Sequence, residues 1–220
     1  CYGLAAVSIT RLSLEEAPKP RSTTSVWTEI GEGLQVLKQV PSVRGAMLHL
    51  VLLYSLLAAL YVLALQLAAL IESLGPSGFG ALLAMSGVGM AIGAVVIAQA
   101  GHRFSRRILS ATGLGTITWT LVLLSQLRGS LVFTLSLCGI LGVGAALVAI
   151  PAQTTIQEET PESERGRVFG LQNNLINIAL SLPLVLAGTL VSSIGLQPVL
   201  LLLAGLALTA ALIERPWQRC

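Results

Sequence analysis

The chain has 220 residues, of which 54% are hydrophobic and only 10% are charged, and its mean hydropathy is +0.83. Soluble domains carry about 25% charged residues, so this chain lacks the polar surface that coats a globule in water. The composition excludes an ordinary soluble enzyme, a disordered chain and a collagen-like chain, and it indicates an all-α integral membrane protein. The three cysteines, Cys1, Cys138 and Cys220, have no CxxC spacing and predict neither a disulfide framework nor a metal site.

The first 44 residues contain no complete membrane span. Residues 1–9 are apolar but too few to cross a bilayer, and we expect them to be the end of a truncated preceding transmembrane helix. Residues 10–44 are expected to form a cytoplasmic linker. Within it, four apolar residues fall at helical spacing before Pro41 ends the run: Trp27, Ile30, Leu34 and Leu37. This pattern predicts an amphipathic helix on the membrane surface, with a regulatory or partner-binding helix as the alternative.

Six apolar stretches follow within residues 45–213, and each is long enough to span a bilayer, which takes roughly 20 helical residues. We expect these spans to form a six-helix transmembrane bundle, with residues 214–220 as a cytoplasmic tail. Short turns join the spans, so neighbouring helices are expected to be antiparallel. The spans are Gly45–Leu67, Gly78–Ala100, Ile108–Leu127, Ser130–Ile150, Val168–Ser192 and Leu196–Ile213.

The distribution of lysine and arginine predicts the orientation. With six spans, twelve of the 13 basic residues fall on one side of the membrane, and only Arg128 falls on the other. Cytoplasmic loops carry the excess of lysine and arginine in membrane proteins. We therefore expect a multi-pass protein of the inner (plasma) membrane with both chain ends in the cytoplasm. The same asymmetry accounts for the net charge of +3 without a nucleic-acid partner.

Two loop segments and the linker together resemble the C-terminal half of a major facilitator superfamily transporter. The segment Ala98–Arg107 is similar to the family pattern G-x-L-A-D-R-x-G-R-R, with His102 in place of the acid and Ala98 and Ser105 in place of two glycines. Pro151–Gln153 followed by Thr160–Gly170 resembles the loop and fifth-span entry of drug and siderophore exporters of this superfamily. The long linker that precedes six spans is similar to the one between the two halves of that fold.

The resemblance implies secondary active transport by alternating access, in which two six-helix halves rock around a midplane site. The expected partners are a small-molecule substrate, the lipid bilayer and an N-terminal six-helix half that this sequence lacks; no cofactor or metal is expected. The family would place the first, second, fourth and fifth spans around the substrate cavity. The cavity candidates are then two tyrosines seven residues apart and a polar stripe on the fifth span: Tyr54, Tyr61, Asn173, Asn177 and Ser181. Hydrogen bonding between helices is the alternative role of the asparagines.

Charged residues near the cytoplasmic loops are gate candidates: Arg103, Arg106, Arg107, Glu162, Glu164 and Arg165. We expect Arg106 and Arg107 to pair with Glu162 or Glu164 and to latch the inward side. The alternative is helix initiation, in which Thr160 caps a helix that begins at Pro161 and the glutamates complement its positive end.

Inside the spans the sequence carries no Glu, Lys or Arg, and this favours a neutral, amphipathic substrate. Gly89 and Gly93 form a GxxxG pair on the second span, and we expect them to allow close helix packing, with a hinge as the alternative.

An intramembrane protease and a non-transporting membrane protein are the two alternatives to transport. Gly75–Gly78 matches the G-x-S-G pattern of rhomboid-type intramembrane proteases, but neither His49 nor His102 can reach Ser77 across a spanning helix, so no enzyme is predicted. A non-transporting assembly factor or receptor built on a transporter-like bundle remains the alternative function.

Overall fold

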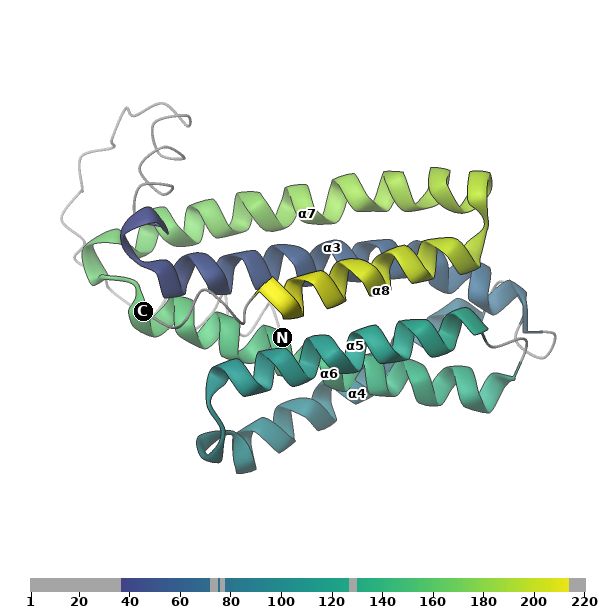
Figure 1. The fold of residues 1–220 in the computed structure, drawn as a ribbon, viewed down its shortest axis with the longest axis horizontal. Helices are drawn as coiled ribbons and strands as arrows, with labels where there is room; N and C mark the ends of the chain where they lie inside the picture. Colours follow the sequence, from purple (N-terminus) through teal and green to yellow (C-terminus); the bar gives the residue numbers. More distant parts are fainter. Residues whose placement is uncertain (1–36, 72–74, 76–77, 127–129, 214–220) are drawn as a thin grey trace, which may run out of the picture.

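A computed structural model describes residues 37–71, 75, 78–126 and 130–213 of the chain. Its six long helices alternate in direction and lie side by side (Figure 1). They are α3 (Pro41–Ala69), α4 (Phe79–Ala100), α5 (Arg106–Gln126), α6 (Leu131–Glu159), α7 (Arg165–Ile194) and α8 (Leu196–Ile213), with the short 3-10 turns η2 (Gly101–Arg103) and η3 (Glu162–Glu164) between them. Each of the six apolar stretches forms a helix, and the predicted all-α polytopic bundle is confirmed.

Local chemistry explains where α3 begins and where α7 ends. Pro41 stands in the first turn of α3, where its missing N–H would have had no helical partner. Gly195 follows α7 with a φ of +86°, a left-handed conformation that costs glycine little, and its N–H donates to the carbonyl of Val191 at 3.0 Å. The chain can therefore reverse within one residue and start α8.

The fourth span is longer than expected. We predicted that it would stop at Ile150 and that Pro151–Gln153 would belong to the following loop, but α6 continues through Pro151 to Glu159. A proline removes one backbone hydrogen bond without ending a helix when its neighbours hold the helix in place. Pro151 is buried in the bundle, and this explains why the helix continues. The extra turns carry Thr155, Glu158 and Glu159 beyond the span.

The helices pack around α3 and α6. The α4 helix packs on α6, α5 packs between α6 and α8, and α7 packs on α3. The main core cluster draws fully buried leucines from α3 and α5, such as Leu63, Leu114 and Leu121. A second cluster joins Leu37 and Met47 to Ile156 and Val168. The two helices left least covered are α4 and α7, with 17% of the apolar stretch of each buried, against 56% for α6.

By length and composition, α3, α4, α5, α6 and α7 can each cross a membrane. The α8 helix has 18 residues, roughly 27 Å at 1.5 Å per residue, and runs back alongside α5. Every charged side chain of the described residues lies where α3, α5 and α7 begin and where α4 and α6 end. We call this the charged end; it comprises Lys38, Arg44, Arg103, Arg106, Arg107, Glu158, Glu159, Glu162, Glu164, Arg165 and Arg167. The predicted turns around residues 76 and 128 and the linker helix before residue 37 lie outside the described residues.

Candidate functional site

The polar stripe on α7 faces away from the bundle. Asn173, Asn177 and Ser181 are exposed, whereas the opposite side of α7 buries apolar residues such as Val168 and Leu171 against the rest of the structure. The Ser181 hydroxyl donates to the backbone carbonyl of Asn177 at 2.8 Å, so it is satisfied by its own helix, and the side chains of Asn173 and Asn177 remain exposed. An uncovered row of amides on an otherwise apolar helix requires water, a solute or another protein surface opposite it.

The two tyrosines of α3 have different surroundings. Tyr54 is half-buried and packs against the apolar cluster near the charged end. Tyr61 is 50% exposed and makes an edge-to-face contact with Phe79 of α4, with ring centroids 6.1 Å apart and an interplanar angle of 88°. Such pairs are a preferred aromatic geometry. Tyr61 therefore packs on the start of α4, and about half of the residue remains exposed.

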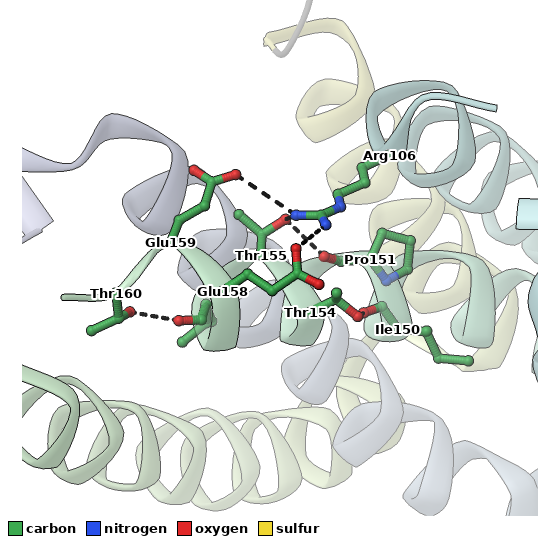
Figure 2. Close-up of polar contacts among 9 residues, drawn as sticks. Arg106, Ile150, Pro151, Thr154, Thr155, Glu158, Glu159 and Thr160 are labelled. Atoms are coloured by element: carbon green, nitrogen blue, oxygen red, sulfur yellow. Dashed lines mark hydrogen bonds and ion pairs between the residues drawn. The ribbon is translucent and has the colours of Figure 1, made fainter. Parts of the chain in front are cut away.

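Arg106 is the centre of the polar contacts at the charged end (Figure 2). Its guanidinium forms an ion pair with Glu158 and lies 3.7 Å from Glu159 Oε1. The same guanidinium donates from Nη1 to Thr155 Oγ1 at 3.3 Å, and that hydroxyl donates in turn to the carbonyl of Pro151 at 2.9 Å. One arginine at the start of α5 thus holds the last turns of α6, the part that follows Pro151.

This pairing differs from the expected one. We predicted that Arg106 and Arg107 would pair with Glu162 or Glu164, but Arg106 binds Glu158 and Glu159 because α6 continues two turns beyond Pro151. Glu164 pairs instead with Arg167 on the next turn, at 2.8 Å. The remaining gate candidates, Arg103, Arg107, Glu162 and Arg165, are all exposed. Among the described residues, no ion pair joins Arg107 to either of the predicted glutamates.

Thr160 does not cap the helix that follows it. Its buried hydroxyl donates backwards to the carbonyl of Ile156, and Thr160 itself ends α6 in an extended conformation. The N-cap position of η3 is Pro161, which has no side-chain cap, and α7 begins only at Arg165. The predicted N-cap is therefore wrong: Thr160 satisfies a carbonyl at the end of α6.

Sequence reasoning missed a pair of glutamines between α6 and α7. Gln172 Nε2 donates to Gln153 Oε1 at 2.7 Å. Gln172 is only 7% exposed, and its Oε1 is buried without a hydrogen-bond partner. A signal was present, because Gln172 follows Val168 by four residues and precedes Ala179 by seven, which places it on the buried face of α7.

The two glycines of α4 lie against α6. A Cβ on Gly89 would stand 1.9 Å from the carbonyl oxygen of Gly139, and a Cβ on Gly93 would stand 2.7 Å from Ala146 Cβ. From the other side, a Cβ on Gly142 would stand 2.0 Å from the carbonyl oxygen of Ser86. Backbone thus meets backbone along this seam, as in close-packed membrane helices. In the part of the chain that the structure describes, no three His, Cys, Asp or Glu side chains are placed to hold a metal ion.

Comparisons with known proteins agree with this architecture. The family model for the Major Facilitator Superfamily matches residues 5–216. The chain is 33% identical to the "Uncharacterized MFS-type transporter YfiS" of Bacillus subtilis (strain 168), over 91% of this chain and 49% of the relative. It is 28% identical to the "Multidrug efflux pump Tap" of Mycolicibacterium fortuitum, over 93% of this chain and 50% of that protein. The chain therefore spans about half the length of the curated relatives it matches. With six alternating helices and a match over nearly its whole length, this multi-pass membrane chain belongs to the Major Facilitator Superfamily.

Proposed function

We propose that this chain is one six-helix half of a secondary transporter that exports a small amphipathic solute by alternating access. Membership of a transporter family supports transport, and a relative named as a multidrug efflux pump supports export. The match to about half of each relative supports a partner half outside this chain. In this proposal, the charged end faces the cytoplasm of the cell that carries the protein in its plasma membrane.

The observation that carries the proposal is the uncovered polar stripe on α7. Burying a polar amide against lipid costs free energy. The stripe on α7 does not face the rest of the bundle, so it needs a polar or aromatic neighbour from elsewhere. Asn173 and Asn177 provide hydrogen bonds, and Tyr61 provides an aromatic surface on α3. Away from the charged end, no described residue of the six helices is Lys, Arg or Glu. Such a lining suits an uncharged or weakly charged amphipathic solute.

The proposed position of the partner half follows from the burial of the helices. Because α4 and α7 are the least covered long helices, they are the natural contacts of a second bundle, and the solute would lie between the two bundles. The contacts of Arg106 belong to one half only, since α5 and α6 are both in this chain. We therefore assign Arg106 to bracing the ends of α5 and α6 as one unit that rocks, rather than to a latch between halves.

The test is transport by the full-length protein that contains this chain. We expect purified protein in liposomes to move an amphipathic dye with saturable kinetics, and Asn177→Ala to lower the rate. Thr209→Ala on α8 is a matched control, because this exposed hydroxyl donates only to its own helix, to the carbonyl of Leu206 at 3.0 Å. Absence of saturable flux for a broad panel of solutes would contradict the proposal and favour a non-transporting membrane protein.

A further inference from the structure

Two exposed arginines lie where η2 and α5 meet, and neither forms an ion pair in the described residues. They are Arg103 in η2 and Arg107 in α5. Arg106, which lies between them, turns inward to Glu158 and Glu159. Glu158 and Glu159 are thus paired with Arg106, and in the described residues no ion pair neutralises the two outer guanidiniums.

Apolar side chains are exposed beside these arginines. Phe104 and Ile108 are each 52% exposed, and each directly follows one of the two arginines in the sequence. In water such apolar surface is costly, but at the boundary between headgroups and acyl chains both kinds of side chain find a partner. The α5 start therefore has the composition of a membrane interface.

From Ile108, the residue next to Arg107, the outward face of α5 forms a continuous stripe at helical spacing: Ile108, Thr112, Gly115, Trp119 and Val122, all exposed. The Thr112 hydroxyl donates to its own helix, to the carbonyl of Ile108 at 2.8 Å, so this polar side chain is satisfied within the stripe. A Cβ on Gly115 would meet nothing within 4 Å, so no other described part of the chain covers α5 between Thr112 and Trp119.

The length of the stripe matches an acyl chain. Trp119 follows Ile108, the residue next to Arg107, by eleven residues, roughly 16 Å along the axis and on the same face of the helix. One leaflet of hydrocarbon is about 15 Å thick. A lipid with its headgroup at Arg107 would therefore bring the end of an acyl chain level with Trp119, which is 58% exposed.

We propose that this surface, defined by Arg103, Phe104, Arg107, Ile108, Gly115 and Trp119, binds an anionic phospholipid. The two guanidiniums contact the headgroup phosphate, and one acyl chain lies along α5 across Gly115 to Trp119. Charge complementarity selects an anionic over a zwitterionic headgroup. The inference rests on the chain crossing the membrane and is independent of transport and of its direction.

The experiment uses Trp119 as the reporter. In the full-length protein that contains this chain, every other tryptophan, including Trp27 and Trp217, is replaced by Phe. The protein is reconstituted in phosphatidylcholine bilayers that contain either phosphatidylglycerol or phosphatidylcholine with acyl chains brominated near their ends. Bromine quenches indole fluorescence at short range. We expect phosphatidylglycerol to bind beside Trp119 about fivefold or more tightly than phosphatidylcholine does, since one arginine at an anionic surface contributes a factor of about five.

Two double substitutions distinguish a specific lipid site from a general electrostatic attraction of anionic lipid to the charged end. Arg103→Gln/Arg107→Gln should reduce the ratio of phosphatidylglycerol to phosphatidylcholine binding beside Trp119 to near one. Quenching by phosphatidylcholine should stay unchanged. The latter result shows that the variant is still folded and inserted. Arg165→Gln/Arg167→Gln removes two charges from the start of α7 at the same end and should keep the preference. Equal quenching by the two lipids in the parent protein would overturn the proposal. So would a preference that survives in the first variant, or one that is lost equally in both.

Discussion

The backbones of Gly89 and Gly139 are so close that a Cβ added to Gly89 would stand 1.9 Å from the carbonyl oxygen of Gly139. This contact lies at the seam between α4 and α6, with Gly142 opposite Ser86 one turn further along α6. Real Cβ atoms do not approach an oxygen this closely, so a side chain at Gly89 or Gly142 must push the two helices apart. Because α4 has little other cover inside this chain, the seam holds α4 to the bundle.

Gly89→Ala should therefore destabilise the protein. Overpacking of a tight contact costs about 1–3 kcal/mol, which corresponds to a melting temperature several degrees lower. The matched control is Gly205→Ala on α8, where a Cβ would meet nothing within 4 Å. Alanine is the better helix former, so the control should be unchanged or slightly more stable. Thermal unfolding of the full-length protein in detergent measures both, and an unchanged melting temperature for Gly89→Ala would contradict the close packing.

Charge reversals at Arg106 and at Glu158 should have coupled effects on stability. Arg106→Glu places a third carboxylate beside Glu158 and Glu159 and removes a donor from Thr155, so we expect lower thermal stability. Adding Glu158→Arg restores an opposite-charge pair and should recover part of the loss. The pair is partly exposed, with side chains 42% and 58% accessible, so the coupling free energy should be only about 0.5–1 kcal/mol and should shrink at high salt.

Arg107 and Glu162, which the sequence predicted to pair, serve as the control for this double-mutant cycle. Arg107→Glu combined with Glu162→Arg should give additive effects, because both side chains are exposed and no ion pair joins them in the described structure. Coupling between Arg107 and Glu162 as strong as that between Arg106 and Glu158 would show that the contacts at the charged end are wrongly assigned.

Gln172 Oε1 is buried without a hydrogen-bond partner, so replacing this polar side chain by an apolar one of equal size should not destabilise the protein. Gln172→Met keeps the volume and removes the unsatisfied Oε1, while Gln153 is only half-buried and can find another partner. We therefore expect stability to be unchanged or raised by up to about 1 kcal/mol. Gln172→Ala leaves a cavity among apolar neighbours and should lose about 1–3 kcal/mol. A Met variant as unstable as the Ala variant would mean that the glutamine hydrogen bond itself holds α6 to α7. Thermal unfolding distinguishes the two cases.

The stripe on α7 should affect transport and not stability. Asn173→Ala and Asn177→Ala remove exposed amides that form no side-chain hydrogen bond to the described part of this half, so each variant should unfold within a few degrees of the parent. If the stripe faces the solute, each loses roughly one hydrogen bond, or about three- to tenfold in transport efficiency. The liposome assay measures this loss, with Thr209→Ala as the unaffected variant. A large fall in melting temperature with normal transport would instead assign the asparagines to packing against the other half.

Hydropathy alone located all six helices, because a bilayer imposes both a length and an apolar composition on every crossing. It failed at the end of α6, where Pro151 suggests a loop in a single sequence. Whether a proline ends a helix depends on the neighbours that hold the following turn, and here these include Arg106 from α5, 45 residues earlier. The same error hid Glu158 and Glu159 as the partners of Arg106.

The sequence by itself determined the class of the protein, the number and direction of its helices and the end at which its charges gather. These properties depend on the free energy of transferring each side chain from water to hydrocarbon. That free energy is a local property of each residue and is nearly additive along the chain. Only the tertiary structure decided that Arg106 contacts Glu158, that Gln172 is buried beside Gln153 and that Gly89 meets Gly139. Each of these pairs joins two helices through distances of a few ångströms. Such distances depend on how the helices cross and rotate against one another, and no single span specifies that geometry.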